Sequence, residues 1–142
     1  MHSASDVARY ILTYCRKLGR KLDNLHLQKI LYFVWADYYT KTKQRLFLDR
    51  IEAWHYGPVV PSVYRQYSHY VASYINMFDE IELRDAHIDF INGSIKKYSA
   101  IHVSILIKMS HEDGTPWSKC HSNGYSNPIP FEMIEAYCDA HA

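Results

Sequence analysis

Hydrophobic residues recur at helical spacing over most of the chain, which predicts a mainly helical protein. Ser3 with Asp6 three residues later fits a capping box, so a first helix begins there. Gly19 stands where that helix would end. The apolar positions between these two signals follow the helical period and are Val7, Ile11, Cys15 and Leu18.

A second helix follows Asn24, a residue suited to the N-cap. One face of this helix carries Leu27, Leu31, Val34 and Tyr38, and Ile30, Phe33 and Trp35 extend the apolar surface almost all round. A helix that is apolar on most sides belongs in the centre of a domain. We therefore predict that this helix forms the core.

The next segment predicts a strand, a turn and a third helix. Residues Ile51–His55 alternate as in a short strand, and Tyr56-Gly57-Pro58 then breaks the pattern. Pro61 suits the first position of a helix. The expected helix carries Val63, Tyr64, Tyr67, Tyr70, Val71 and Tyr74.

The C-terminal part predicts three further helices. Asp85 can cap one that bears Ile88, Ile91, Ile95 and Tyr98, and Ser99 can cap another that bears Val103, Leu106, Ile107 and Ser110. A loop over 111–127 contains Trp117, a brief strand at Ile129 pairs beside Ile51–Trp54, and Pro130 opens the last helix. The expected fold is all-α, with five to six helices and a minor two-stranded β element, in a single domain over residues 1–142.

Composition agrees with one globular domain of 142 residues, 48% of them hydrophobic and 22% charged. Lys and Arg number 16 against 15 Asp and Glu, whereas dedicated nucleic-acid binders carry a clear basic excess. Basic residues cluster at Arg16-Lys17 and Arg20-Lys21, either as solvated helix ends or as a phosphate-binding face. A DNA-binding autorepressor remains the alternative function, although the second helix is too apolar to read bases.

The location expected for the protein is the cytoplasm. Cys15, Cys120 and Cys138 form no C-x-x-C pair, a pattern typical of reduced thiols. The N-terminal residues lack the basic start and apolar run of a signal peptide. The longest apolar run, Ile30–Ala36, covers seven residues, too few to cross a membrane.

Catalytic and metal-binding patterns are absent from the sequence. The nine histidines form neither H-E-x-x-H nor another zinc spacing, and there is no phosphate-binding glycine loop or G-x-S-x-G elbow. We therefore expect no cofactor, no metal and no enzymatic activity. A hydrolase whose residues assemble from distant positions remains a further alternative. Aromatic residues make up 15% of the chain, including 13 Tyr and 3 Trp, as in surfaces that bind another protein.

Three segments resemble the signature segments of the SocA-like antitoxins, the Panacea-domain family. The first is Leu27-Gln28-Lys29-Ile30-Leu31-Tyr32-Phe33, and the second is Ile51-Glu52-Ala53-Trp54-His55-Tyr56-Gly57-Pro58-Val59-Val60-Pro61. The third combines Ser110-His111-Glu112 with Pro116-Trp117 near the C-terminus. Order and spacing match over nearly the whole chain. His26 and His55 depart from the family, which often has lysine there.

The resemblance implies a bacterial or phage antitoxin that neutralises a cognate protein toxin by direct binding. Some members of the family also hand the bound toxin to a cytosolic AAA+ protease. A complex with a nanomolar Kd requires a binding free energy of about 12 kcal/mol. Such a complex typically buries roughly 1,600 Å² of surface and depends on a few aromatic hot spots.

Two groups of residues are the candidates for this function. The expected partner-binding residues are His55, Tyr56, Tyr64, Tyr67, Tyr70 and Tyr74, the last four because spacings of three and four place them along one side of the third helix. Core packing is the alternative for these tyrosines. The signature residues, which we interpret as mainly structural, are Leu27, Lys29, Tyr32, Glu52, Trp54, Gly57, Pro58, Val59, His111 and Trp117. Lys29 is the lone charge in an apolar run, and Glu52 is its expected partner unless Lys29 lies at the surface.

Overall fold

The structure, a computed structural model, describes residues 1–122 and 126–142. The helices in this part of the chain are α1 (Ala4–Lys17), α2 (Asn24–Thr42), α3 (Pro61–Tyr67), α4 (Ile88–Ser99), α5 (Val103–His111), α6 (Pro116–Cys120) and α7 (Phe131–Ala140). A 3-10 turn covers Ser68–Tyr70, and the strands are β1 (Glu52–Trp54), β2 (Gly57–Val59) and β3 (Asn127–Pro128). The expected mainly helical fold with a minor sheet is confirmed.

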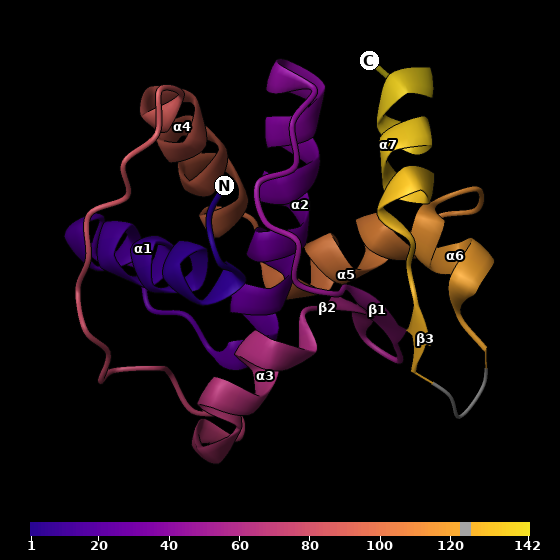
Figure 1. The fold of residues 1–142 in the computed structure, drawn as a ribbon. Coiled ribbons are helices and arrows are strands. Elements are labelled where there is room, and N and C mark those ends of the chain that lie inside the picture. The colour runs from indigo at the N-terminus through magenta and orange to yellow at the C-terminus, as the bar shows by residue number, and fades with distance from the viewer. Residues whose placement is uncertain (123–125) are drawn as a thin grey trace.

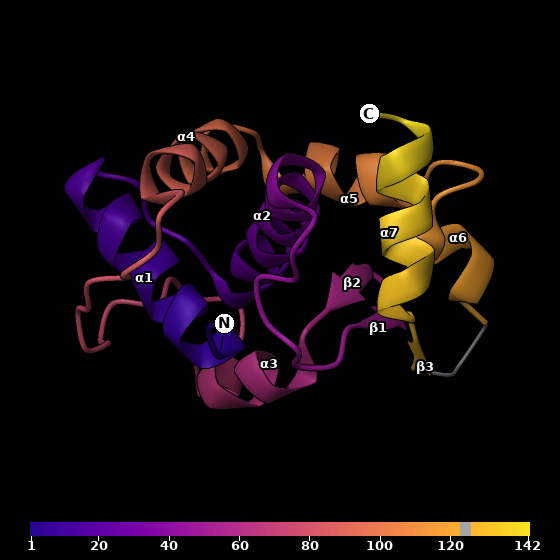
Figure 2. The same cartoon turned by 45° about the horizontal axis from the view of Figure 1, so that its top comes forward.

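Helix α2 forms the centre of the fold, as its apolar pattern predicts. It contacts α1, α3, α4, α5, α7 and β2. In both ribbon views it stands between α1 and α4 on one side and α7 on the other (Figures 1 and 2). Its N-cap is Asp23, whose carboxylate accepts a hydrogen bond from the backbone N–H of His26, and not the predicted Asn24. The Asn24 side chain instead donates to the carbonyl of Tyr64 and joins α2 to α3.

The core on one side of α2 is organised around Trp35, which is fully buried. Its ring stacks on Phe131 of α7 with centroids 5.1 Å apart, and on Tyr39 at 6.1 Å. The indole N–H donates to the carbonyl of Phe47 at 3.1 Å. A single side chain therefore joins α2, α7 and the segment before β1.

The sheet has the order β2-β1-β3, with both pairs antiparallel. The prediction that the chain near Ile129 pairs beside Ile51–Trp54 is confirmed, and the backbone N–H of Ile129 also donates to the carbonyl of Ile51 at 2.8 Å. The prediction misses β2, because Tyr56-Gly57-Pro58 has the composition of a turn. Pro58 is tolerated in a strand here because β2 lies at the edge of the sheet.

Helix α3 begins at Pro61 as predicted but is shorter than expected. It ends at Tyr67, and Val71 then adopts φ 56°, a left-handed conformation that costs a β-branched residue about 1–3 kcal/mol. The predicted alignment of Tyr64, Tyr67, Tyr70 and Tyr74 on one helix face is therefore wrong. These four side chains point into different parts of the molecule.

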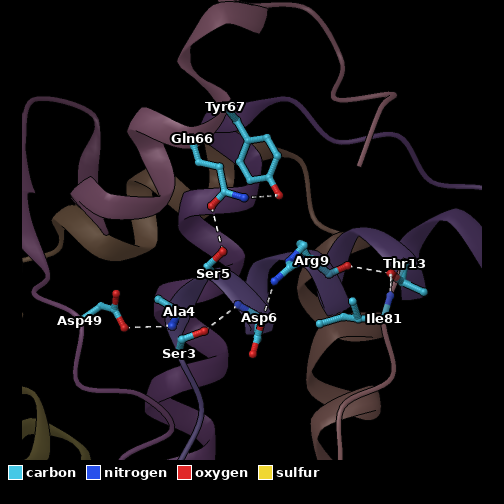
Figure 3. A network of polar contacts seen from close by, with 10 residues as sticks. All are labelled: Ser3, Ala4, Ser5, Asp6, Arg9, Thr13, Asp49, Gln66, Tyr67 and Ile81. Carbon is cyan, nitrogen blue, oxygen red and sulfur yellow. Dashed lines mark hydrogen bonds and ion pairs between the residues drawn. The ribbon is translucent and has the colours of Figure 1, made fainter. Parts of the chain in front are cut away.

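The start of α1 is fixed by polar contacts with segments far away in the sequence (Figure 3). The Ser3 hydroxyl accepts from the N–H of Asp6, which confirms the predicted N-cap. The N–H of Ala4 donates to the Asp49 carboxylate at 2.9 Å, and the Ser5 hydroxyl donates to Gln66 of α3 at 3.0 Å. These contacts attach α1 to the segment before β1 and to α3.

Three boundaries in the C-terminal part differ from the prediction. His87 and His102 occupy the N-cap positions of α4 and α5 in place of Asp85 and Ser99. Trp117 lies in the short helix α6, which is capped by the Thr115 hydroxyl, and not in a loop. Residues 123–125 of that expected loop lie outside the described residues. Within the described ranges, no helix is both long and apolar enough to cross a bilayer.

Candidate functional site

Several of the signature residues meet around the hairpin of β1 and β2, whereas Leu27 and Tyr32 are buried in the core. The indole N–H of Trp117 donates to the carbonyl of Trp54 at 2.7 Å and so attaches α6 to β1. The indole N–H of Trp54 donates to Glu52 at 2.9 Å, and its ring packs edge-on against Tyr64 of α3 with centroids 4.9 Å apart. Residues of α6 and α3 thus hold one hairpin in place.

Lys29 projects from α2 beneath this hairpin and is fully buried. Its ammonium donates to the carbonyl of Pro58 in β2. The expected pairing with Glu52 is wrong, because Glu52 pairs with Arg50 at 2.6 Å and accepts from Trp54. The surface location for Lys29 is also wrong. The lysine is a buried tether between the central helix and the edge strand.

Gly57 provides the space that this tether needs. Its φ of 111° is a conformation that side chains disfavour. A Cβ atom here would lie 2.9 Å from the Ser110 hydroxyl oxygen and 3.0 Å from Cε of Lys29. The glycine therefore allows α2, α5 and the hairpin to approach one another closely.

A stack of rings closes the other side of the hairpin. The indole of Trp117 lies between the imidazoles of His111 and His121, with centroid distances of 3.6 and 4.3 Å. Burial lowers the pKa of His111, and the charges of Lys29, His121 and His55 lower it further. His111 therefore favours the neutral form in the folded protein.

Burial also lowers the pKa of Lys29, to about 7. An unfolded lysine titrates near 10.4, so above pH 7 the unfolded state binds a proton that the folded state loses. The free energy of unfolding should therefore rise with pH through this group, by at most about 1.4 kcal/mol per pH unit. Chemical denaturation of the wild type and of Lys29→Met between pH 7 and 8.5 should show this slope in the wild type alone.

The comparison between the two variants matters because other groups oppose this trend. Burial raises the pKa values of Cys15, Cys120 and Cys138, which reduces stability as unfolded thiols begin to ionise. These thiols are present in both variants and cancel in the difference. Parallel curves for the two proteins would contradict a buried, titrating Lys29.

An apolar groove opens beside the hairpin, and we call it the hairpin groove. It holds about 410 Å³. Its lining comprises Asp23, Asn24, Leu25, Trp54, His55, Tyr56, Val59, Tyr64, Ser68, Val71 and Ala72. Tyr56 is 58% exposed and Val71 83% exposed, so two large apolar side chains stand in solvent at its edge. Exposed apolar surface of this kind is typical of protein-binding sites.

The expected partner-binding residues divide between the surface and the interior. His55, Tyr56 and Tyr64 line the hairpin groove. Tyr67 is only 4% exposed and belongs to the core. The Tyr70 hydroxyl donates to the carbonyl of Met77 and accepts from its N–H, which holds the following loop. Tyr74 is exposed but lines a different groove.

Sequence reasoning missed Val71 and Leu25 as surface residues of this groove. Val71 was expected on the third helix, where an apolar residue at that spacing would face the core. The early end of α3 turns it outward instead. Among residues 1–122 and 126–142, no set of three His, Cys, Asp or Glu side chains is arranged to hold a metal ion.

The family described as "Antitoxin SocA-like, Panacea domain" matches residues 27–118 of this chain. That range contains most of α2 and the whole hairpin, with Lys29, Gly57 and Trp117, whose contacts define the site. The chain belongs to this antitoxin family.

Among curated proteins, the chain is similar to Antitoxin SocA of Caulobacter vibrioides (strain NA1000 / CB15N). The two are 30% identical over 127 residues, which covers 80% of this chain and 68% of that protein. No solved structure matches the chain. Membership and similarity together support an antitoxin role.

Proposed function

We propose that this protein neutralises a cognate protein toxin by stoichiometric binding, with the hairpin groove as the centre of the contact surface. The observation that carries the proposal is the exposed Tyr56 beside an apolar groove whose lining includes the signature residues Trp54 and Val59. Tyrosine combines a large apolar area with a polar hydroxyl and is enriched among interface hot spots. Tyr64 and His55 complete the aromatic lining.

The rigidity of the hairpin supports this assignment. Lys29 holds β2 from below, and Trp117 holds β1 from the side. A surface that is already ordered loses less conformational entropy when a partner binds. The groove itself accommodates only a few side chains of the toxin, so the flanking surface must supply the rest of a standard interface.

The direct test is co-expression with a candidate toxin encoded by the adjacent gene. The toxin alone should stop growth, and co-expression of this chain should restore it. The two proteins should then co-purify in a fixed ratio. Restored growth without a complex would contradict neutralisation by binding.

A Tyr56→Ala variant should weaken toxin binding at least tenfold, because it removes an aromatic side chain from the proposed centre of the interface. Its thermal unfolding should stay close to that of the wild type, since the side chain is largely exposed. Titration calorimetry with the purified toxin measures the change in affinity.

Tyr74→Ala is the matched control for this experiment. Tyr74 is 57% exposed, nearly the same as Tyr56, but lies outside the hairpin groove. Unchanged toxin affinity is expected for it. If both variants bind as well as the wild type, the hairpin groove is not the contact site.

The second part of the proposal is that the captured toxin is delivered to a cytosolic AAA+ protease, as the family resemblance implies. The half-life of the toxin in cells should then shorten when this chain is present. An unchanged half-life in a strain where the toxin is neutralised would separate neutralisation from delivery and remove the second part.

A further inference from the structure

A second groove lies at the end of α1, and we call it the basic groove. It holds about 480 Å³ between the α1–α2 connection and the segment 73–78. The buried side chains of Leu12, Cys15 and Ile75 and the partly buried Phe78 form its apolar floor. The N–H of Ile75 donates to the carbonyl of Leu22 at 2.8 Å and joins its two walls.

Positive charge borders this apolar floor on the side of α1 and the α1–α2 connection. Arg16, Arg20 and Lys21 line the groove. Arg20 donates to the carbonyl of Lys96 at 2.8 Å and so places the end of α4 beside them. Lys17, Lys96 and Lys97 are exposed at these two helix ends. Glu80 pairs with Arg16 at 3.2 Å and offsets part of the charge.

Helix dipoles explain some of these cations but not their arrangement. Arg16 and Lys17 occupy the last turn of α1, and Lys96 and Lys97 the last turn of α4, where basic residues are favourable. Lys21 belongs to neither helix and still lines the groove. The helix dipoles therefore account for the cations at the ends of α1 and α4 but not for Lys21 beside the apolar floor.

We infer that the basic groove binds an acidic amphipathic peptide segment of a partner protein. An aromatic or aliphatic side chain of the segment enters the groove and packs on its apolar floor. The carboxylates on either side of it face the basic rim, which is formed by Arg16, Arg20 and Lys21 with the neighbouring Lys17, Lys96 and Lys97. Complementary charges fix the register of such a segment and accelerate its association. The backbone of a DNA duplex presents phosphates but no apolar group for the floor, so the peptide is the favoured occupant.

This site is separate from the hairpin groove, and its test needs no toxin. The probe is a fluorescein-labelled peptide with glutamates on both sides of a central Leu-Phe pair, measured by fluorescence anisotropy with the full chain. A peptide with lysines in place of the glutamates is the charge control. The acidic peptide should bind, with an affinity that falls as the salt concentration rises. The basic peptide should not bind.

Paired variants locate the site. Lys21→Glu combined with Lys96→Glu should lower the affinity for the acidic peptide at least tenfold, because both substitutions reverse exposed charges at the basic rim. Lys108→Glu reverses an exposed charge on α5, away from the groove, and should leave binding unchanged. Tyr74→Ala should weaken binding of the peptide but leave binding of the toxin unchanged. Tyr56→Ala should have the opposite effect.

Three results would overturn the inference. The wild type fails to bind the acidic peptide, or Lys108→Glu weakens it as much as the rim variant does. The third is that a short DNA duplex binds more tightly than the peptide and loses affinity in the rim variant, which would assign the groove to nucleic acid. Thermal unfolding of each variant confirms that the fold is intact.

Discussion

Replacing Trp35 by alanine should lower the free energy of unfolding by about 3–5 kcal/mol, the usual cost of truncating a large buried aromatic residue. The ring stacks on Phe131 and Tyr39, and its N–H is bonded to the carbonyl of Phe47. The truncation leaves a cavity next to α7 and an unpaired buried carbonyl. Urea denaturation followed by circular dichroism measures this loss of stability. The loss is large compared with the free energy of unfolding of a typical protein, about 5–15 kcal/mol.

Trp35→Phe separates the two contributions. It keeps an aromatic ring in the stack but removes the hydrogen bond to Phe47. The free energy of unfolding of this variant should therefore fall by less, about 1–3 kcal/mol, because of the unpaired carbonyl and some lost side-chain volume. Equal stability of the alanine variant and the wild type would show that α7 does not depend on Trp35.

Gly57→Ala should destabilise the protein and disrupt the hairpin. The new methyl group would lie closer to Ser110 and Lys29 than carbon atoms normally approach, and φ is 111°. Strain of this kind costs roughly 1–3 kcal/mol, and displacement of the buried Lys29 from Pro58 adds to it. Denaturation measures the stability loss, and toxin binding should decrease because the hairpin groove is built on this turn.

Gly93→Ala is the control for this prediction. Gly93 lies inside α4, and a Cβ atom there would meet nothing within 4 Å. Alanine is about 1 kcal/mol more favourable than glycine in a helix interior, so this variant should gain stability. Gly57→Ala with wild-type stability and wild-type toxin affinity would contradict the role assigned to the turn.

The family's signature residues have different functions in this structure. Lys29, Gly57 and Trp117 fix the position of the hairpin from below and from the side. Tyr56 stands in solvent at its tip. The buried residues hold the hairpin in position, whereas Tyr56 remains exposed.

Features that depend on near neighbours in the chain were predictable. The Ser3 cap, the start of α3 at Pro61 and the apolar character of α2 follow from local spacing, and the family match over residues 27–118 includes all three signature segments. The strand near Ile129 was predictable in place, because its pairing partner was the one recognisable strand. The second strand of the hairpin was missed, since its residues also suit a turn.

The sequence by itself determined that a helix rich in apolar residues would be central and that Lys29 within it needed a partner. Only the tertiary structure decided that this partner is a backbone carbonyl of Pro58, that Tyr67 is interior, and that Val71 faces solvent. The physical reason is the range of the interactions. Helical period and capping act over a few residues, whereas the acceptor for a buried amino group depends on which distant segments pack against the helix.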